Sequence, residues 1–198
     1  HYNEIPPSLS KIFGSEELLI LLPSKADPKS LEYYRELAKT WSADSTKKID
    51  IMMDRDIAQL PPKKSIWIFG MENSYASAVK QGLKDYDAEI TLETVRLGKT
   101  SYKSNVNSYI ISVRHPDNPA AVLVLLSTDS KEAAQGLARK LPHYGKYSYL
   151  VFEGSEPTNT GKGEWESSNS PLSARIAPAG KVVSTELPVR KALAVLAP

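Results

Sequence analysis

Short apolar runs separated by helix-like segments are the feature of this sequence that most restricts its fold. Each run is five or six residues long and is bounded by proline, glycine or polar residues. Continuous apolar runs of this length are typical of strands that are buried on both faces. The runs are Glu17–Leu22, Ile49–Met53, Ser65–Phe69, Tyr109–Val113, Ala121–Leu126 and Tyr147–Phe152.

Three segments between these runs have helical periodicity. Leu31, Leu37 and Trp41 share one face of the first, and the other two are Tyr75–Lys84 and Lys131–Leu141. Strands that alternate with helices predict an α/β protein, because parallel neighbours need crossover connections. We expect a three-layer α/β/α sandwich around a mostly parallel sheet of about five or six strands, flavodoxin-like in style.

The other segments are polar or lack a clear period. Residues 1–14 predict an extended lead-in, residues 88–97 an edge strand, and residues 98–107 a polar loop. Polar residues and glycine dominate from Gly154 to Ser170. We therefore predict an α/β domain at residues 1–153 and an irregular, extended C-terminal tail at residues 154–198, packed on the domain or on a neighbour.

The composition excludes several classes of protein. The 25 basic and 23 acidic residues are mixed along the 198-residue chain, so it carries no signature of nucleic-acid binding or of a polybasic membrane surface. Without cysteine there are no disulfides, thiolate nucleophiles or cysteine-ligated metal sites. The longest apolar runs are far shorter than the ~20 residues of a transmembrane helix, so no membrane span is expected.

Polar residues follow several predicted strands, where α/β proteins place their ligands. The candidate ligand contacts are Asp54, Asn73, Ser74, Thr128 and Ser130. Amides at the start of the following helices suit an anion, but ordinary helix capping explains the same residues. Asp54 together with Asp56 fits either a magnesium site or a solvated turn.

The sequence contains no complete catalytic constellation. His1, His115 and His143 are isolated, and none begins a His-Glu-x-x-His zinc motif. The sequence also lacks a Gly-x-Ser-x-Gly elbow and a glycine-rich phosphate loop. We therefore predict no catalytic residue, no metal ligand and no cofactor in this chain.

One turn gathers aromatic and cationic side chains, and a tryptophan lies further along in the polar segment. These residues are Lys140, His143, Tyr144, Lys146, Tyr147 and Trp165. Aromatic rings beside cations make good interface anchors, which predicts a docking surface. Alternatively, the rings cover one end of the core.

The same region resembles a known family. The motifs that carry the resemblance are Arg139–Gly154, Pro157-Thr158-Asn159, Lys162-Gly163, Trp165 and Ser170-Pro171-Leu172, with His115–Pro119 upstream. They are similar to the C-terminal segment of bacterial aminopeptidase N-like zinc metallopeptidases of the membrane alanyl aminopeptidase type. Gly70-Met71-Glu72-Asn73 also resembles the Gly-Ala-Met-Glu-Asn motif of these enzymes, although Phe69 and Gly70 replace its first two residues.

The resemblance implies a non-catalytic accessory domain that serves domain packing or substrate access in a larger, exported zinc aminopeptidase of the periplasm or cell envelope. Zinc would then belong to the parent enzyme, and the catalytic part of the parent would be the partner. Because the chain begins with His1, we expect a processed product or a fragment. Two alternatives are an independent small-ligand-binding module of flavodoxin-like shape and a hydrolase in its own right.

Overall fold

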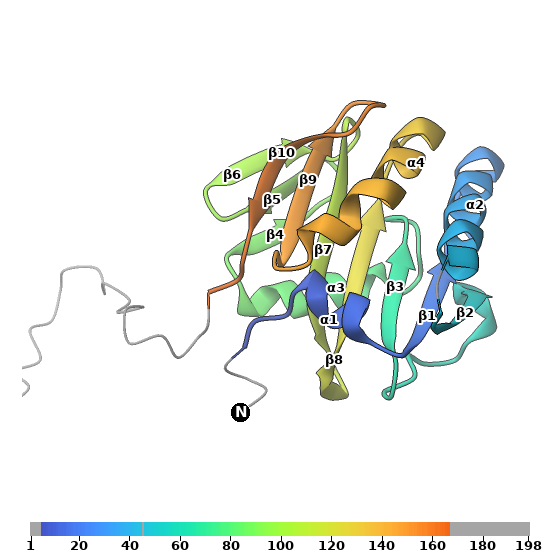
Figure 1. Ribbon diagram of the computed structural model, residues 1–198. Helices are drawn as coiled ribbons and strands as arrows, with labels where there is room; N and C mark the ends of the chain where they lie inside the picture. The colour runs from blue at the N-terminus through green and yellow to red at the C-terminus, as the bar shows by residue number, and fades with distance from the viewer. Residues whose placement is uncertain (1–4, 45, 167–198) are drawn as a thin grey trace, which may run out of the picture. The chain divides into compact units, whose positions relative to one another are not determined.

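A computed structural model describes residues 5–44 and 46–166, which contain two sheets. The strands of the large sheet are β1 (Glu17–Leu22), β2 (Lys48–Met53), β3 (Ser65–Phe69), β7 (Asn107–His115), β8 (Asn118–Ser127), β9 (Tyr149–Glu153) and β10 (Thr158–Gly163). Their order is β10-β9-β7-β8-β3-β1-β2 (Figure 1). The small sheet has the order β4-β5-β6 and consists of β4 (Ala88–Ile90), β5 (Thr94–Leu97) and β6 (Thr100–Lys103).

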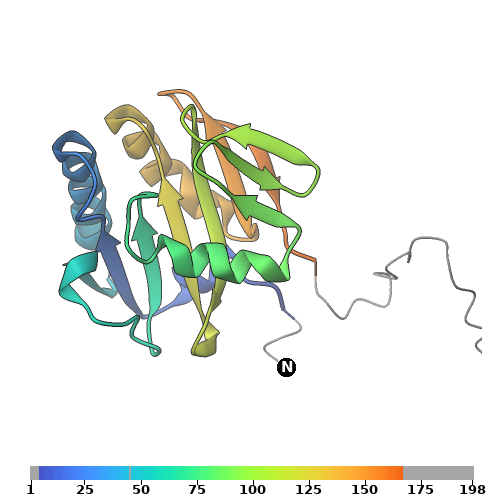
Figure 2. The same ribbon diagram turned by 180° about the vertical axis from the view of Figure 1, so that it is seen from behind.

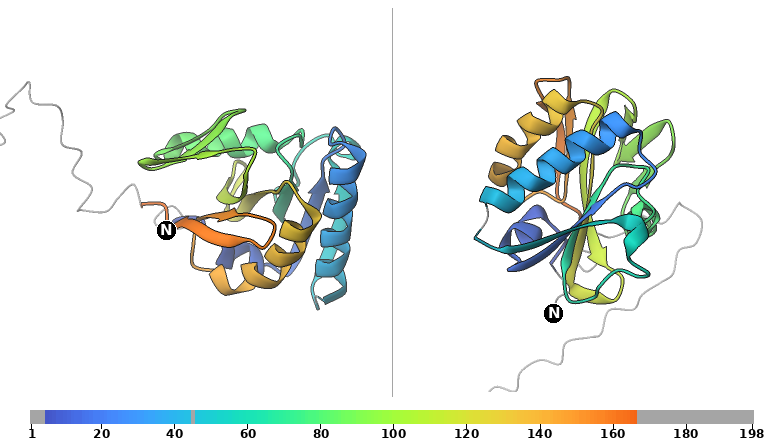
Figure 3. Two further views of the ribbon diagram at one scale, coloured as in Figure 1. Left: turned by 90° about the horizontal axis from the view of Figure 1, so that it is seen from above. Right: turned by 90° about the vertical axis from the view of Figure 1, so that its right-hand side faces the viewer.

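Helices lie on both faces of the large sheet. One face carries α1 (Leu9–Gly14), α2 (Pro28–Asp44) and α4 (Lys131–Lys140), as Figure 1 shows. The other face carries α3 (Ala76–Gly82) and the small sheet (Figures 2 and 3). Short 3-10 turns complete the described elements: η2 (Asp54–Asp56), η3 (Leu83–Asp85) and η4 (Leu141–Tyr144).

Strand β1 shows why the apolar runs are continuous. Leu18, Ile20 and Leu22 belong to the core cluster under α1, α2 and α4. Leu19 and Leu21 belong to the cluster on the side of α3 and the small sheet. Successive side chains of a strand point to opposite faces, so a strand with a core on each side needs apolar residues at every position. The predicted central strands are therefore confirmed as elements.

The prediction of a mostly parallel, flavodoxin-like sandwich of five or six strands is wrong. Strands β2, β1, β3 and β8 run parallel to one another. Strand β7 pairs antiparallel with both β8 and β9, β10 pairs antiparallel with β9, and the strands of the small sheet are also antiparallel. The physical reason lies in the link between β7 and β8. Only Pro116 and Asp117 separate these strands, and so short a turn joins antiparallel neighbours only.

Three segments expected to be irregular contain regular structure. Helix α1 lies in the predicted lead-in, and β6 lies in the predicted loop. The predicted edge strand at residues 88–97 is instead the hairpin of β4 and β5. The predicted irregular tail begins with β10, which extends the large sheet beside β9. Residues 167–198, with the motif Ser170-Pro171-Leu172, lie outside the described residues.

None of the helices in residues 5–44 and 46–166 combines the length and the hydropathy needed to cross a membrane. The longest, α2, has 17 residues, and charged side chains interrupt it throughout.

Candidate functional site

Asp54 joins the carboxyl ends of β1, β2 and β3. It lies in η2 directly after β2, and its side-chain oxygens accept hydrogen bonds from the backbone N–H groups of Ser24 (2.9 Å) and Ser74 (2.7 Å). The residue is only 1% exposed. Burial favours a raised pKa for the Asp54 carboxyl, but the hydrogen bonds from Ser24 and Ser74 outweigh burial and hold this pKa below its usual range. Asp54 is therefore a buried carboxylate that connects three loops.

Asn73 makes a second connection at the same edge. Its side-chain Nδ2 donates to the carbonyls of Leu21 (3.0 Å) and Phe69 (3.2 Å), the last parts of β1 and β3. Its Oδ1 accepts from the backbone N–H of Tyr75 (3.0 Å). The structure thus brings together the predicted contacts Asp54, Asn73 and Ser74, and their hydrogen bonds hold the loops in place.

Thr128 and Ser130 follow β8 at the same edge. The Thr128 carbonyl accepts hydrogen bonds from the hydroxyls of Tyr33 (2.8 Å) and Tyr34 (3.1 Å). The Ser130 hydroxyl accepts from the backbone N–H of Ala133 (3.1 Å) and caps the start of α4. Capping therefore accounts for Ser130, whereas Thr128 reaches the wall of a cavity.

This cavity, the carboxyl-edge pocket, has a volume of about 510 Å³. Its wall combines the first two turns of α2, the loops after β3 and β8, helix α3, and one end of the small sheet, where the β4–β5 turn lies beside the end of β6. Three charged side chains line it: Glu72 after β3, Lys80 on α3 and Asp129 after β8. Within the described part of the chain, none of the three makes a hydrogen bond or an ion pair, so their charges are available to a ligand.

Tyr33 lies where the negative charges of this pocket meet. Burial raises the pKa of the Tyr33 hydroxyl, and the carboxylates of Asp27, Glu72 and Asp129 raise this pKa further. Asp27 is bound to the start of α2 through the N–H and hydroxyl of Ser30. The remaining two carboxylates give the pocket a net negative charge beside the single ammonium of Lys80.

The sequence named none of the charged residues of this pocket as a ligand contact, although Glu72 belongs to the motif Gly70-Met71-Glu72-Asn73. Glu72 and Asp129 lie in strand-end loops that the sequence did indicate, so their position carried a signal. Lys80 is a half-buried residue of α3. Lysine is common on helix surfaces, so its position in the sequence carried no signal of a site. Thr91 and Ser104 enter the wall through the small sheet, which the sequence did not predict.

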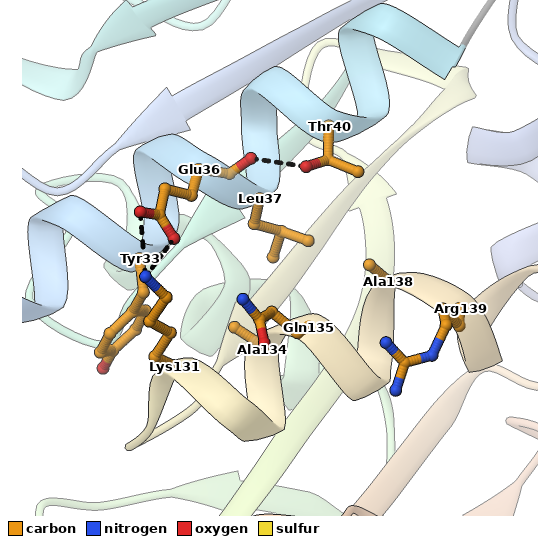
Figure 4. A pocket seen from close by; sticks show the side chains of 9 residues that line it. All are labelled: Tyr33, Glu36, Leu37, Thr40, Lys131, Ala134, Gln135, Ala138 and Arg139. Atoms are coloured by element: carbon orange, nitrogen blue, oxygen red, sulfur yellow. Dashed lines mark hydrogen bonds and ion pairs between the residues drawn. The ribbon is translucent and has the colours of Figure 1, made fainter.

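A separate groove lies between α2 and α4 (Figure 4) and has a volume of about 410 Å³. Lys131 and Glu36 meet across one end of it at 3.1 Å, and Arg139 stands at the other end. The ion pair is about half exposed, so it stabilises the domain little. None of the predicted site residues lines this groove.

The predicted docking turn has an exposed, cationic part. His143 and Lys146 are exposed. The Lys146 ammonium lies 5.0 Å from the centroid of the Tyr147 ring, and the Lys162 ammonium from β10 lies 5.4 Å from the same centroid. This part of the turn offers a partner two ammonium groups and one aromatic ring.

The rest of the turn is attached to the domain. The Lys140 ammonium donates to the carbonyl of Pro157. The Tyr144 ring meets the Phe152 ring edge-on, with 5.5 Å between centroids. These two side chains cover the end of the core, as the alternative interpretation of the turn expects.

Trp165 lies inside the domain and is 6% exposed. Its ring stacks on Tyr86 at 4.8 Å between centroids and contacts Tyr149 at 4.7 Å. Its indole N–H donates to the carbonyl of Ser112 (2.8 Å). The fold brings Trp165 to this place because β10 returns along the edge of the large sheet before the chain reaches it.

His115 is a buried histidine at the end of β7, 2% exposed. Its Nδ1 accepts from the backbone N–H of Asp117 (3.1 Å), and its Nε2 has no hydrogen-bond partner among the described residues. Burial lowers the pKa of this imidazole, against the opposing influence of Asp117 and of the Pro61 carbonyl. The fold therefore favours the neutral ring.

Acidification is expected to weaken the fold through His115. Because the folded pKa lies below the unfolded value of about 6.5, the unfolded chain takes up the proton first. The stability that comes from the neutral His115 ring is fully present above about pH 6.5 and is lost as the pH falls through the folded pKa of His115. The free energy of unfolding, measured with urea, should fall less between about pH 7.5 and about pH 5.5 for His115→Gln than for the native chain. His143→Gln, at an exposed histidine, is the control, and equal losses in all three proteins would contradict the expectation.

No group of three or more histidine, cysteine, aspartate or glutamate side chains that suits a metal ion occurs in residues 5–44 and 46–166. His115 and His143 lie apart, on β7 and η4, and His1 lies outside the described residues. The described residues thus do not fit the zinc site of the peptidases named above.

Comparison with known proteins gives no match to a protein-family model and no similar curated sequence. The likeness to aminopeptidase N-like metallopeptidases therefore rests on the sequence motifs alone.

Proposed function

We propose that this domain binds a small polar ligand in the carboxyl-edge pocket. The observation that carries the proposal is the convergence of Glu72, Lys80 and Asp129, without partners in the described chain, on one cavity of about 510 Å³. Ligand pockets generally measure about 300–1,000 Å³. The site lies at the carboxyl ends of β1, β3 and β8, which are parallel, and open α/β sheets bind ligands at this edge.

The charges of the pocket favour one class of ligand. Two carboxylates oppose a single ammonium, so a phosphate or another anion meets net repulsion. Hydroxyl groups of Ser30, Thr91 and Ser104 line the same wall. A neutral or zwitterionic molecule with several hydrogen-bonding groups fits these walls better than a nucleotide or a flavin phosphate.

Charge-removing variants test the proposal. Thermal unfolding is measured with sugars, polyols, amino acids and, for comparison, nucleotides. A ligand at about 100 times its Kd stabilises the native chain by about 2.7 kcal/mol. Glu72→Gln and Asp129→Asn are each expected to weaken binding about tenfold, since each removes a charged hydrogen-bond acceptor. Glu132→Gln, an exposed carboxylate of α4 outside the pocket, is the matched control.

Two results would contradict this assignment. One is the absence of stabilisation by every neutral and zwitterionic compound. The other is an equal loss of affinity in Glu132→Gln, which would place the ligand elsewhere on the surface.

A second function, an accessory domain of a larger zinc aminopeptidase, is favoured by the exposed turn with His143, Lys146 and Tyr147. In this role the chain supplies no catalytic group and packs against the catalytic part or controls substrate access. Zinc belongs to the catalytic part, and the whole protein is exported to the periplasm or cell envelope. The support for this role is the resemblance together with the cationic, aromatic surface of the turn.

The reading frame upstream of His1 tests the second function. We expect it to encode a region with His-Glu-x-x-His and a downstream glutamate, and a frame that starts close to His1 would contradict the proposal. In the whole protein, the double variant His143→Ala, Lys146→Ala is expected to lower the equilibrium constant for docking of this domain on the catalytic part about tenfold or more. Lys63→Ala with Lys99→Ala, at two exposed lysines outside the turn, is the control.

A further inference from the structure

Strand β2 forms one end of the large sheet, with β1 on one side and no further described strand on the other (Figure 1). None of its six residues is buried, whereas five of the six residues of β1 are. Ile51 and Met52 are 36% and 37% exposed. Apart from the ladder with β1, no backbone group of Lys48–Met53 makes a hydrogen bond within the described part of the chain. The outer edge of β2 therefore presents unpaired N–H and C=O groups.

The opposite edge of the sheet, β10, differs in each of these respects. Strand β10 has a register shift between Asn159 and Gly161, and none of its side chains is a large apolar one. Such irregular, polar edges discourage pairing with another chain. Strand β2 pairs with β1 without a register shift, contains no proline or glycine, and exposes two large apolar side chains. Of the two edges, β2 is the one that suits a further strand.

The charges on β2 favour a second copy of the same strand as its neighbour. Lys48 and Asp50 are two residues apart, so their side chains point to the same face of the sheet. When two copies of β2 run antiparallel with Ile49 opposite Ile49, Lys48 of each copy lies opposite Asp50 of the other. Opposite charges in such positions stabilise a sheet. A pair centred on Asp50 would instead place two carboxylates together, so the charges select one register.

Both charged side chains are able to make these contacts. Lys48 is exposed and makes no ion pair or hydrogen bond with any described residue. Asp50 is partly exposed, and only its Oδ2 accepts from the ammonium of Lys64, which leaves Oδ1 to accept from a second ammonium. On the other face of the sheet, the same register gathers Ile49 and Ile51 of both copies around the twofold axis. The register thus pairs charges on one face and apolar side chains on the other.

We propose that two copies of this chain associate through β2, which joins their large sheets into one continuous sheet. The strands pair antiparallel around Ile49, with an ion pair between Lys48 and Asp50 on each side of the axis. This pairing uses the same surface of both copies, so it closes at two chains. The edge shares no residue with the carboxyl-edge pocket, and either proposal can fail without the other.

Single cysteines test the register, because the native chain has none. Residues directly opposite in an antiparallel pair have Cα atoms about 4.5–5.5 Å apart, within the range that a disulfide spans. Ile49→Cys is therefore expected to give a disulfide-linked dimer under mild oxidation. Ile51→Cys is the control, because Ile51 is the more exposed of the two residues. In this register its two copies are four residues apart along the strands, roughly 13 Å, and should not cross-link.

Exchange of charges tests the ion pairs. Sedimentation equilibrium of the native chain up to about 1 mM is expected to show a monomer–dimer equilibrium. Lys48→Glu places two carboxylates opposite each other, and Asp50→Lys places two ammonium groups opposite each other, so each variant alone is expected to dimerise about tenfold more weakly. A mixture of the two variants restores both opposite-charge pairs and is expected to form a heterodimer about as strong as the native dimer. Lys99→Glu, at an exposed lysine outside β2, is the control.

Three results would overturn the proposal. One is a native chain that stays monomeric to about 1 mM, as expected if a segment of a longer protein covers β2 instead. The second is cross-linking of Ile51→Cys as fast as that of Ile49→Cys, since exposure alone would then control oxidation. The third is a mixture of the charge variants that associates no better than either variant alone. The cysteine pair tests the proposal even where Asp50→Lys does not fold.

Discussion

A Trp165→Ala variant is expected to lose about 4 kcal/mol of its free energy of unfolding. The Trp165 side chain is 6% exposed and packs against the rings of Tyr86 and Tyr149. Alanine would leave a cavity between these rings and would leave the Ser112 carbonyl without its indole donor. Urea titration followed by circular dichroism measures the loss, and thermal unfolding should show a midpoint lower by about 10 °C.

Two further variants make this expectation specific. Glu166→Ala changes the next residue, which is exposed, and should stay within about 0.5 kcal/mol of the native chain. Trp165→Phe keeps an aromatic ring but not the indole N–H, so an intermediate loss of about 1–2 kcal/mol is expected. A Trp165→Ala variant as stable as Glu166→Ala would show that residues beyond β9 contribute little to the core.

The elements that could be predicted are those whose burial requires apolar residues at regular positions in their own sequence. Strands β1, β3 and β8 are apolar at successive positions because a core lies on each side of them. Helices α2 and α4 show the spacing of a helix that buries one face. These signals are local, so they identify an element but not the direction of its neighbour in the sheet. The antiparallel half of the large sheet was missed for this reason.

Strand β10 shows a second limit. Its sequence, with Gly161 and Gly163, indicates a loop, yet it pairs with β9 along the sheet edge. A Cβ atom at Gly163 would lie 2.2 Å from the hydroxyl oxygen of Tyr149, so this glycine leaves room for the Tyr149 ring to lie over β10. The glycine has a packing role that is visible only once its neighbour is known.

The candidate site likewise contains some residues that the sequence indicated and others that it did not. The rule that ligands lie at strand ends directed attention to Asp54, Asn73 and Ser74, which the structure brings together. The rule could not show that their polar atoms bind the chain itself. It also could not supply Lys80, because the cavity depends on how α3 and the small sheet lie against the carboxyl edge.

Asp54→Ala is expected to lose about 3 kcal/mol of the free energy of unfolding. The carboxylate is 1% exposed and accepts the N–H groups of Ser24 and Ser74, and hydrogen bonds to a charged group contribute about 1.5–3 kcal/mol each. Both amides would lose their acceptor in the variant. Asp56→Ala in the same turn is the control, because its side chain is 55% exposed and its contact with Arg55 measures 3.8 Å.

The pH dependence distinguishes a lost charge from a general loosening of the loops. The folded pKa of Asp54 lies below its usual value, so on acidification the unfolded chain takes up the proton first. The contribution of the carboxylate is therefore present above about pH 3.9 and is lost as the pH falls through the folded pKa. The stability difference between the native chain and Asp54→Ala should narrow in acid, while the difference for Asp56→Ala stays small throughout. A difference that is as large at about pH 3 as at about pH 7 would mean that Asp54 acts through packing, and the hydrogen bonds of Asn73 would then be the polar link between the ends of β1 and β3.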